Sequence, residues 1–214
     1  MQKPILPAVL VVLILCAACG SSLAAVAKPA AETKIGVVEM EKVWKDYELS
    51  KKYSADFEAL RAKKKAQLDR WDRNRLLTEV QLRELDTLYD KAGPTDGDKA
   101  RIKAIEDDAT KLDAEMKDLQ AKKEPTVDDK KRLDELNARS AKTDETLRKM
   151  AEQADTELAD INAKWSKEVK DNITAAIQKI AEQKGIPLVL DKTAVLFGGT
   201  DLTTPVVDYL NKKK

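Results

Sequence analysis

The sequence contains no histidine, and its two cysteines, Cys16 and Cys19, both stand near its start. Histidine is the commonest general base near neutral pH and the commonest metal ligand, so its absence removes the usual catalytic and zinc-binding arrangements. A chain that loses its first 27 residues keeps no cysteine, which excludes disulfides, thiol nucleophiles and thiolate metal sites. We therefore expect no catalytic residue, no metal site and no cofactor, and we do not expect an enzyme.

Aromatic residues are also scarce, at 4% of the chain, whereas charged residues make up 36%. Two conventional globular cores would need more aromatic and branched apolar volume than this. A charged composition dominated by Ala, Leu, Lys and Glu favours long exposed helices or coiled coil. The alternative is a disordered middle, which the regular apolar spacing described below disfavours.

The first 27 residues have the features of a cleaved signal peptide. Lys3 is the only charged residue there, an apolar run covers residues 5–18, and small residues at 25–27 form a cleavage site, so we expect cleavage after Ala27. An uncleaved anchor is one alternative, although the apolar run is shorter than the about 20 residues that span a bilayer. Lipid attachment at Cys19 is the other alternative.

The charges of the mature chain balance. Removing Lys3 from the 39 basic residues leaves the same number as the 38 acidic ones. A nucleic-acid partner is not expected, because such binders carry a basic excess on one face. The lysine runs at 63–65 and 122–123 are interpreted as solvated helix faces, with weak contact to a membrane surface as the alternative.

Two short apolar blocks at opposite ends of the chain predict a small sheet. We expect a strand at 34–39, a second at 188–190 and a third at 194–197, followed by a tight bend at Gly198-Gly199 that leaves a hairpin. Neither block is large enough to fold alone, so the ends of the chain have to meet. Residues 28–45 and 185–214 are accordingly predicted to form one body, and 46–184 a helical arm.

The middle of the chain predicts long helices with two breaks. No Gly or Pro occurs from Lys45 to Ala92, which indicates one continuous helix of about 70 Å. Residues 93–98 contain Gly and Pro, and residues 124–126 contain Pro, so both segments predict breaks. The last long helix is expected from Val127 to Lys184, with Gly185 as its C-cap.

The tryptophans and the paired carboxylates are candidate functional residues. Trp71 and Trp165 lie on the apolar stripes of two helices, which favours core packing over contact with a binding partner. The pairs Asp107-Asp108 and Asp128-Asp129 stand beside basic residues on solvated helices, so no catalytic role is assigned to them.

Four segments together resemble the Skp/OmpH family of periplasmic chaperones. They are LVLDKTAVLFGGTDLT at 188–203, VVDYLN at 206–211, IGVVEMEKV at 35–43 and AAIQKIAEQKG at 175–185. The region between residues 71 and 148 is longer than the family pattern and broken twice. The better-known members of the family are basic, whereas this mature chain is neutral.

The resemblance implies an α+β, mostly α fold, in which a long antiparallel coiled-coil arm is inserted into a small β-body formed by the N- and C-terminal strands. It implies a homotrimer in which three arms enclose a cavity for unfolded outer-membrane proteins, without ATP. The trimer core would consist of Ile35, Val37, Leu188, Leu190, Val195 and Phe197. A structural coiled-coil spacer or scaffold of the cell envelope is the competing hypothesis. No individual client-binding residue is predicted, and the place where the arm turns is left open between the two breaks.

Overall fold

The computed structural model describes residues 34–212. The predicted signal peptide, its cleavage site at Ala27 and the alternative lipid attachment at Cys19 all lie outside these residues.

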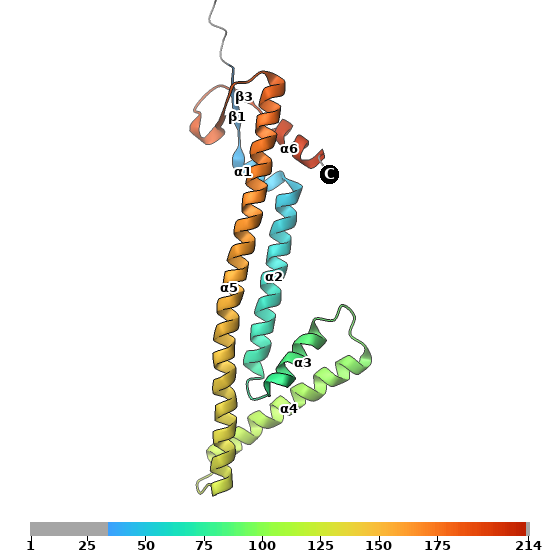
Figure 1. The fold of residues 1–214 in the computed structure, drawn as a ribbon, viewed down its shortest axis with the longest axis vertical. Helices are drawn as coiled ribbons and strands as arrows, with labels where there is room; N and C mark the ends of the chain where they lie inside the picture. Colours follow the sequence, from blue (N-terminus) through green and yellow to red (C-terminus); the bar gives the residue numbers. More distant parts are fainter. Residues whose placement is uncertain (1–33, 213–214) are drawn as a thin grey trace, which may run out of the picture. The chain divides into compact units, whose positions relative to one another are not determined.

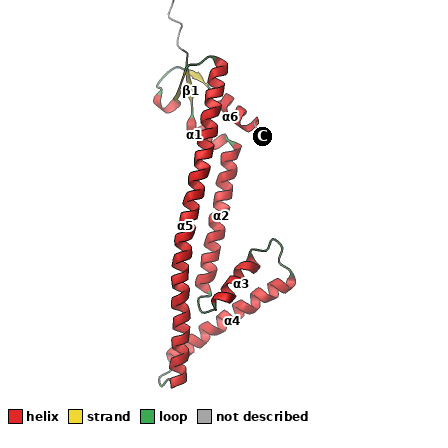
Figure 2. Ribbon diagram, viewed as in Figure 1, coloured by secondary structure: helices red, strands yellow, loops and turns green. Residues whose placement is uncertain are grey.

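The described chain is mostly helical, with one small three-stranded sheet, which confirms the α+β, mostly α prediction (Figures 1 and 2). The elements follow in the order β1 Ile35–Val38, α1 Met40–Asp46, α2 Glu48–Arg73, α3 Glu79–Tyr89, α4 Asp96–Ala121, α5 Val127–Lys184, β2 Leu188–Asp191, the short 3₁₀ helix η1 Lys192–Ala194, β3 Thr200–Asp201 and α6 Thr203–Lys212.

The sheet joins the two ends of the chain, as the apolar blocks predict. Its strand order is β2-β1-β3, and β1 runs parallel to both neighbours. The predicted strand at 194–197 and its hairpin are wrong. The side chain of Asp191 accepts a hydrogen bond from the N–H of Thr193 at 2.8 Å, which turns the chain into η1, and the next strand forms only at Thr200 on the far side of β1.

One hydrophobic core fills the space between this sheet and the helices α1, α5 and α6. Its fully buried residues include Val38, Val43, Ile173, Leu202 and Val206. Gly36 lies on the same face of the sheet, where a Cβ would approach Leu202 Cδ1 to 2.9 Å, so only glycine lets the strand pack this closely.

Helix α5 extends from this core as the longest element and packs along α2, which runs in the opposite direction (Figure 1). Its 58 residues correspond to a length of about 87 Å. The predicted bounds are confirmed at both ends. Thr126 caps the N-terminus in a capping box with Asp129, and Gly185 ends the helix in the left-handed conformation at φ +63°.

The predicted continuous helix from Lys45 to Ala92 is wrong. The chain is extended at Tyr47 between α1 and α2, and α2 ends at Arg73. The amide of Asn74 donates to the carbonyl of Arg70 at 2.8 Å, and Thr78 then caps α3 in a capping box with Gln81. Side-chain hydrogen bonds therefore end α2 and start α3 without Gly or Pro.

Both predicted breaks are turns. The first lies between α3 and α4, and it is shorter than predicted because Asp96 to Asp98 already form the first turn of α4, capped by Thr95. The second returns the chain from α4 into α5. The paired helices α3 and α4 pack against α2 and α5 through a second core, which consists of Trp71, Leu77, Leu82, Leu85, Leu88, Ile105 and Ala109. We call this region, residues 74–126 with the parts of α2 and α5 that contact it, the elbow.

Candidate functional site

An apolar surface lies on the face of the sheet opposite the core. In the register of β1 and β2, Ile35 is paired with Leu188 and Val37 with Leu190, so these four side chains share one face. Ile35 is 39% exposed, Leu188 45% and Leu190 36%. Nothing within the described residues covers this face fully, and we call it the outer sheet face.

Val37 is the exception on this face, because it is only 4% exposed. Gly199 lies against it, and a Cβ at Gly199 would come within 2.6 Å of Val37 Cγ1. Gly199 also has φ +93°, which disfavours any residue with a side chain. Gly199 therefore lets the loop before β3 lie close to the sheet, because it has no side chain and tolerates a positive φ.

The loop at 195–199 adds further apolar side chains. Phe197 is 97% exposed and Val195 is half-buried. Leu196, which is not among the predicted trimer-core residues, is fully exposed. Exposed bulky apolar residues next to an open apolar sheet face mark a candidate interaction surface.

A charged cluster fixes the end of β3 beside this surface. The ammonium of Lys192 lies 3.2 Å from Asp201 and 3.5 Å from Glu39. Hydrogen bonds from Thr203 hold the pKa of Asp201 at about 2, with Lys192 as a further cause. The N–H of Glu39 donates to the hydroxyl of Thr203 at 3.0 Å, which ties the start of α6 to the end of β1.

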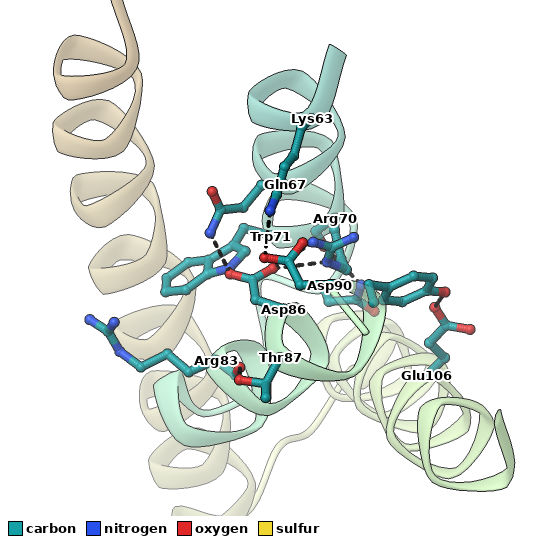
Figure 3. A network of polar contacts seen from close by, with 11 residues as sticks. Lys63, Gln67, Arg70, Trp71, Arg83, Asp86, Thr87, Asp90 and Glu106 are labelled. Carbon is teal, nitrogen blue, oxygen red and sulfur yellow. Dashed lines mark hydrogen bonds and ion pairs between the residues drawn. The ribbon is translucent and has the colours of Figure 1, made fainter. Parts of the chain in front are cut away.

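The elbow contains a buried polar network centred on Asp86 of α3 (Figure 3). Its carboxylate accepts hydrogen bonds from Gln67 Nε2 at 2.7 Å, Arg70 Nε at 2.9 Å and Trp71 Nε1 at 2.7 Å. The side chains of Arg70 and Asp86 are only 10% and 14% exposed. All three donors come from α2, so this carboxylate fixes the position of α3 against α2.

The same network continues to α4 through Tyr89. The guanidinium carbon of Arg70 lies 4.5 Å from the centroid of the Tyr89 ring, and the hydroxyl of Tyr89 donates to Glu106 of α4 at 2.7 Å. This hydrogen bond, followed by burial, raises the pKa of Tyr89. The contacts join three helices around one arginine (Figure 3).

Ion pairs between helices brace the rest of the elbow. Arg101 of α4 makes two hydrogen bonds to Glu84 of α3, and Arg132 of α5 makes two to Glu115 of α4. The hydrogen bond with Glu115 is the main cause that raises the pKa of Arg132. Paired forks of this kind fix geometry more strongly than single contacts do.

Most lysines of the runs at 63–65 and 122–123 form ion pairs with carboxylates. Lys63 lies 3.0 Å from Asp90, Lys64 2.5 Å from Glu157 and Lys122 2.5 Å from Asp129. Lys122 is the first cause that lowers the pKa of Asp129 to about 2, with hydrogen bonds from Thr126 following.

The three tryptophans have different environments. Trp71 is 2% exposed and belongs to the elbow core, as the packing interpretation predicts. Trp165 is half-buried, with its ring stacked on Tyr53, and Trp44 remains 37% exposed. Trp44 and Trp165 thus retain accessible ring surface.

The acidic side chains of residues 34–212 form no cluster suited to a metal ion. No group of three or more Asp, Glu, Cys or His side chains in this range is placed to hold a metal ion. Of the paired carboxylates, Asp107 accepts a hydrogen bond from Lys103 and Asp108 accepts one from Lys111, while Asp129 accepts one from the N–H of Thr126, the N-cap of α5. Across the same range, none of the helices combines the length and the apolar character that a membrane span requires.

Comparison with known families gives one match. A family model described as outer membrane protein (OmpH-like) matches residues 83–210, which is more than half of the chain. The matched range runs from within α3 to α6 and includes β2, the loop at 195–199 and β3. A comparison with curated proteins found no match.

Proposed function

Because this chain belongs to the OmpH-like outer membrane protein family, we propose that it is an ATP-independent holdase chaperone of the periplasm that binds unfolded outer-membrane proteins. In this proposal the signal peptide directs export and is removed. The chain works as a homotrimer, and no catalytic residue or cofactor takes part.

The outer sheet face is the observation that carries the proposal. Ile35, Leu188 and Leu190 form an exposed apolar surface beside the fully exposed Leu196 and Phe197. Burying such side chains contributes about 25 cal/mol per Å² of apolar area, which drives association. We infer that three copies meet through this face, with Ile35, Val37, Leu188, Leu190, Val195 and Phe197 at the contact.

The helices then provide the client surface. With three sheets joined, the paired helices α2 and α5 of each copy become antiparallel coiled-coil arms around a shared space. A groove of about 350 Å³ between α2, α3 and α5 brings the partly exposed Leu68 and Met150 next to charged side chains. Many weak apolar contacts of this kind hold an unfolded chain without requiring one sequence, because each contributes little on its own.

Suppression of aggregation tests the holdase function. A urea-unfolded β-barrel protein is diluted into buffer with and without stoichiometric trimer, and turbidity is followed. We expect turbidity to fall as trimer is added, without ATP. Unchanged turbidity at stoichiometric amounts would refute the proposal.

A structural spacer or scaffold of the cell envelope is the second candidate. The observation that favours it is the braced elbow, where Arg101–Glu84 and Arg132–Glu115 pairs stiffen the arm. A spacer is expected to form the same oligomer but to leave the turbidity of the unfolded protein unchanged, so the same assay separates the two functions.

A further inference from the structure

Four of the aromatic rings gather in one place. The chain has three Trp, four Tyr and two Phe residues in all. Trp44 of α1, Tyr53 and Phe57 of α2, and Trp165 of α5 line a single groove of about 190 Å³. A chain this poor in aromatic residues therefore concentrates them where the helices leave the sheet.

The rings in this groove, which we call the aromatic groove, are only partly used for packing. Tyr53 and Trp165 stack with centroids 4.7 Å apart and an angle of 9° between their planes, which covers one face of each ring. Phe57 is half-buried, and Trp44 is 37% exposed. Aromatic surface is thus left open beside a preformed stack.

The charge of the aromatic groove has one sign. Glu58 lines it, and the remaining polar lining consists of Ser50, Ser54, Ser166 and Asn162. Among the described residues no lysine or arginine lines it, although the chain contains 39 of them. Arg61 lies beside it, with a guanidinium nitrogen 4.0 Å from the carboxylate of Glu58, and both side chains are mostly exposed, so this long ion pair leaves Glu58 open to a second cation. The groove between α2, α3 and α5, by contrast, is lined by Lys64, Arg83 and Lys149.

A second carboxylate lies next to the stack. The hydroxyl of Tyr53 donates to Glu168 at 2.9 Å, and this hydrogen bond is the main cause that raises the pKa of Tyr53. Glu58 therefore lines a groove walled by aromatic rings, and Glu168 is hydrogen-bonded to one of those rings.

The size of the groove limits its occupant. Pockets for drug-sized ligands measure about 300–1,000 Å³, so a groove of about 190 Å³ fits a single side chain. Aromatic faces attract cations, and the planar guanidinium of arginine both stacks on rings and pairs with carboxylates.

We propose that the aromatic groove binds an arginine side chain of an extended client segment. The guanidinium lies against the ring surface of Trp44 and Trp165, and Glu58 balances its charge. The inference rests on the proposed function, because it identifies one of the contacts by which the chaperone holds an unfolded protein.

Fluorescence titration of the assembled protein tests this site. Trp71→Phe removes the tryptophan outside the groove, so the emission then reports Trp44 and Trp165. The probes are short Gly/Ser peptides that each carry one arginine, one glutamine or one phenylalanine. We expect saturable quenching by the arginine peptide and about tenfold weaker binding of the other two, which is the gain of a well-placed cation on aromatic faces. The same titration of the protein with its native Trp71 guards against an effect of that substitution on folding.

Two exposed residues give matched variants. Glu58→Gln and Trp44→Leu are each expected to weaken arginine-peptide binding several-fold, whereas Glu106→Gln, on the elbow, leaves it unchanged. The proposal is overturned if the phenylalanine peptide binds as tightly as the arginine peptide. It is equally overturned if acrylamide fails to quench the combined emission of Trp44 and Trp165 in the free Trp71→Phe protein, which would mean that a second copy covers the groove. Quenching by phosphatidylcholine vesicles but not by the arginine peptide would overturn it as well.

The turbidity assay keeps this inference separate from the proposed function. Protection of an unfolded client without arginine-peptide binding refutes the aromatic groove alone. Loss of protection by the unaltered protein refutes the holdase function itself.

Discussion

Replacing Asp86 with alanine removes the acceptor that holds α3 against α2. Three donors lose their partner at once: the amide of Gln67, the guanidinium of Arg70 and the indole N–H of Trp71. Arg70 is 9% exposed as a residue and Trp71 2%, so water reaches neither of them freely. The alanine variant therefore leaves a nearly buried positive charge without its carboxylate.

The expected cost follows from this burial. Breaking a fully buried ion pair by removing one partner costs about 3–5 kcal/mol. The side chains here are 10% and 14% exposed, so some water compensates, and we expect Asp86→Ala to lower the free energy of unfolding by about 2–4 kcal/mol. Asp86→Asn keeps one acceptor oxygen but loses the charge, and its expected cost is about 1–2 kcal/mol.

Equilibrium unfolding in urea at one fixed protein concentration measures these values, because oligomer stability depends on concentration. The matched control is Asp107→Ala, which removes an exposed carboxylate paired with Lys103 on α4 and is expected to change the free energy of unfolding by no more than about 0.5 kcal/mol. The reasoning is refuted if the Asp86 and Asp107 variants unfold at the same urea concentration.

Three other predictions concern the sheet and its loop. Leu190→Asp places a charge on the outer sheet face and is expected to reduce the mass in light scattering to that of one chain. Val80→Asp, on α3 and more exposed than Leu190, is expected to leave the mass unchanged. Gly199→Ala combines φ +93° with a Cβ clash and is expected to lower the melting temperature more than Gly198→Ala, which has a similar φ of +89° but open space, and equal melting temperatures would contradict the close contact. The pKa of Asp201 lies at about 2 in the folded protein, below its ordinary value of 3.8, so its contribution to stability is complete above the ordinary value and is lost as the pH falls through 2. Asp201→Asn is expected to flatten the acid dependence of the melting temperature between pH 3.8 and about 2. An unchanged profile would show that this carboxylate is not the cause of that dependence.

The long helix α5 shows what local signals achieve. Its predicted bounds, Val127 and Lys184, are both confirmed, because caps such as Thr126 and Gly185 act through residues adjacent in the sequence. The same kind of signal was present at Thr78 and Gln81, which form a capping box before α3. The break at 74–78, which was not predicted, shows that the absence of Gly and Pro does not guarantee a continuous helix.

The elbow could not be predicted in the same way. Asp86 meets Arg70 across 16 residues and only because α3 folds back on α2. On a single helix, residues at this spacing are far apart, so no periodic pattern marks the pair. The contact depends on the turn at 74–78, and a sequence analysis that misses this turn also misses the contact.

The prediction of a strand at 194–197 was wrong for a different reason. Ala194 to Phe197 are four apolar residues in succession, and such a run has the composition of a buried strand. The structure places Leu196 and Phe197 on the surface instead, beside the open sheet face. In the proposed homotrimer a second copy covers this run, and sequence alone does not distinguish such a run from a core strand, since both would bury the same side chains.

Light scattering of the mature protein, alone and with an unfolded β-barrel protein, tests the central claim most directly, because it reports assembly and client binding together. The account predicts three times the mass of one chain for the free protein, and a single larger species of that mass plus one client after mixing. A mass of one chain for the free protein, with the client aggregating beside it, would contradict the account.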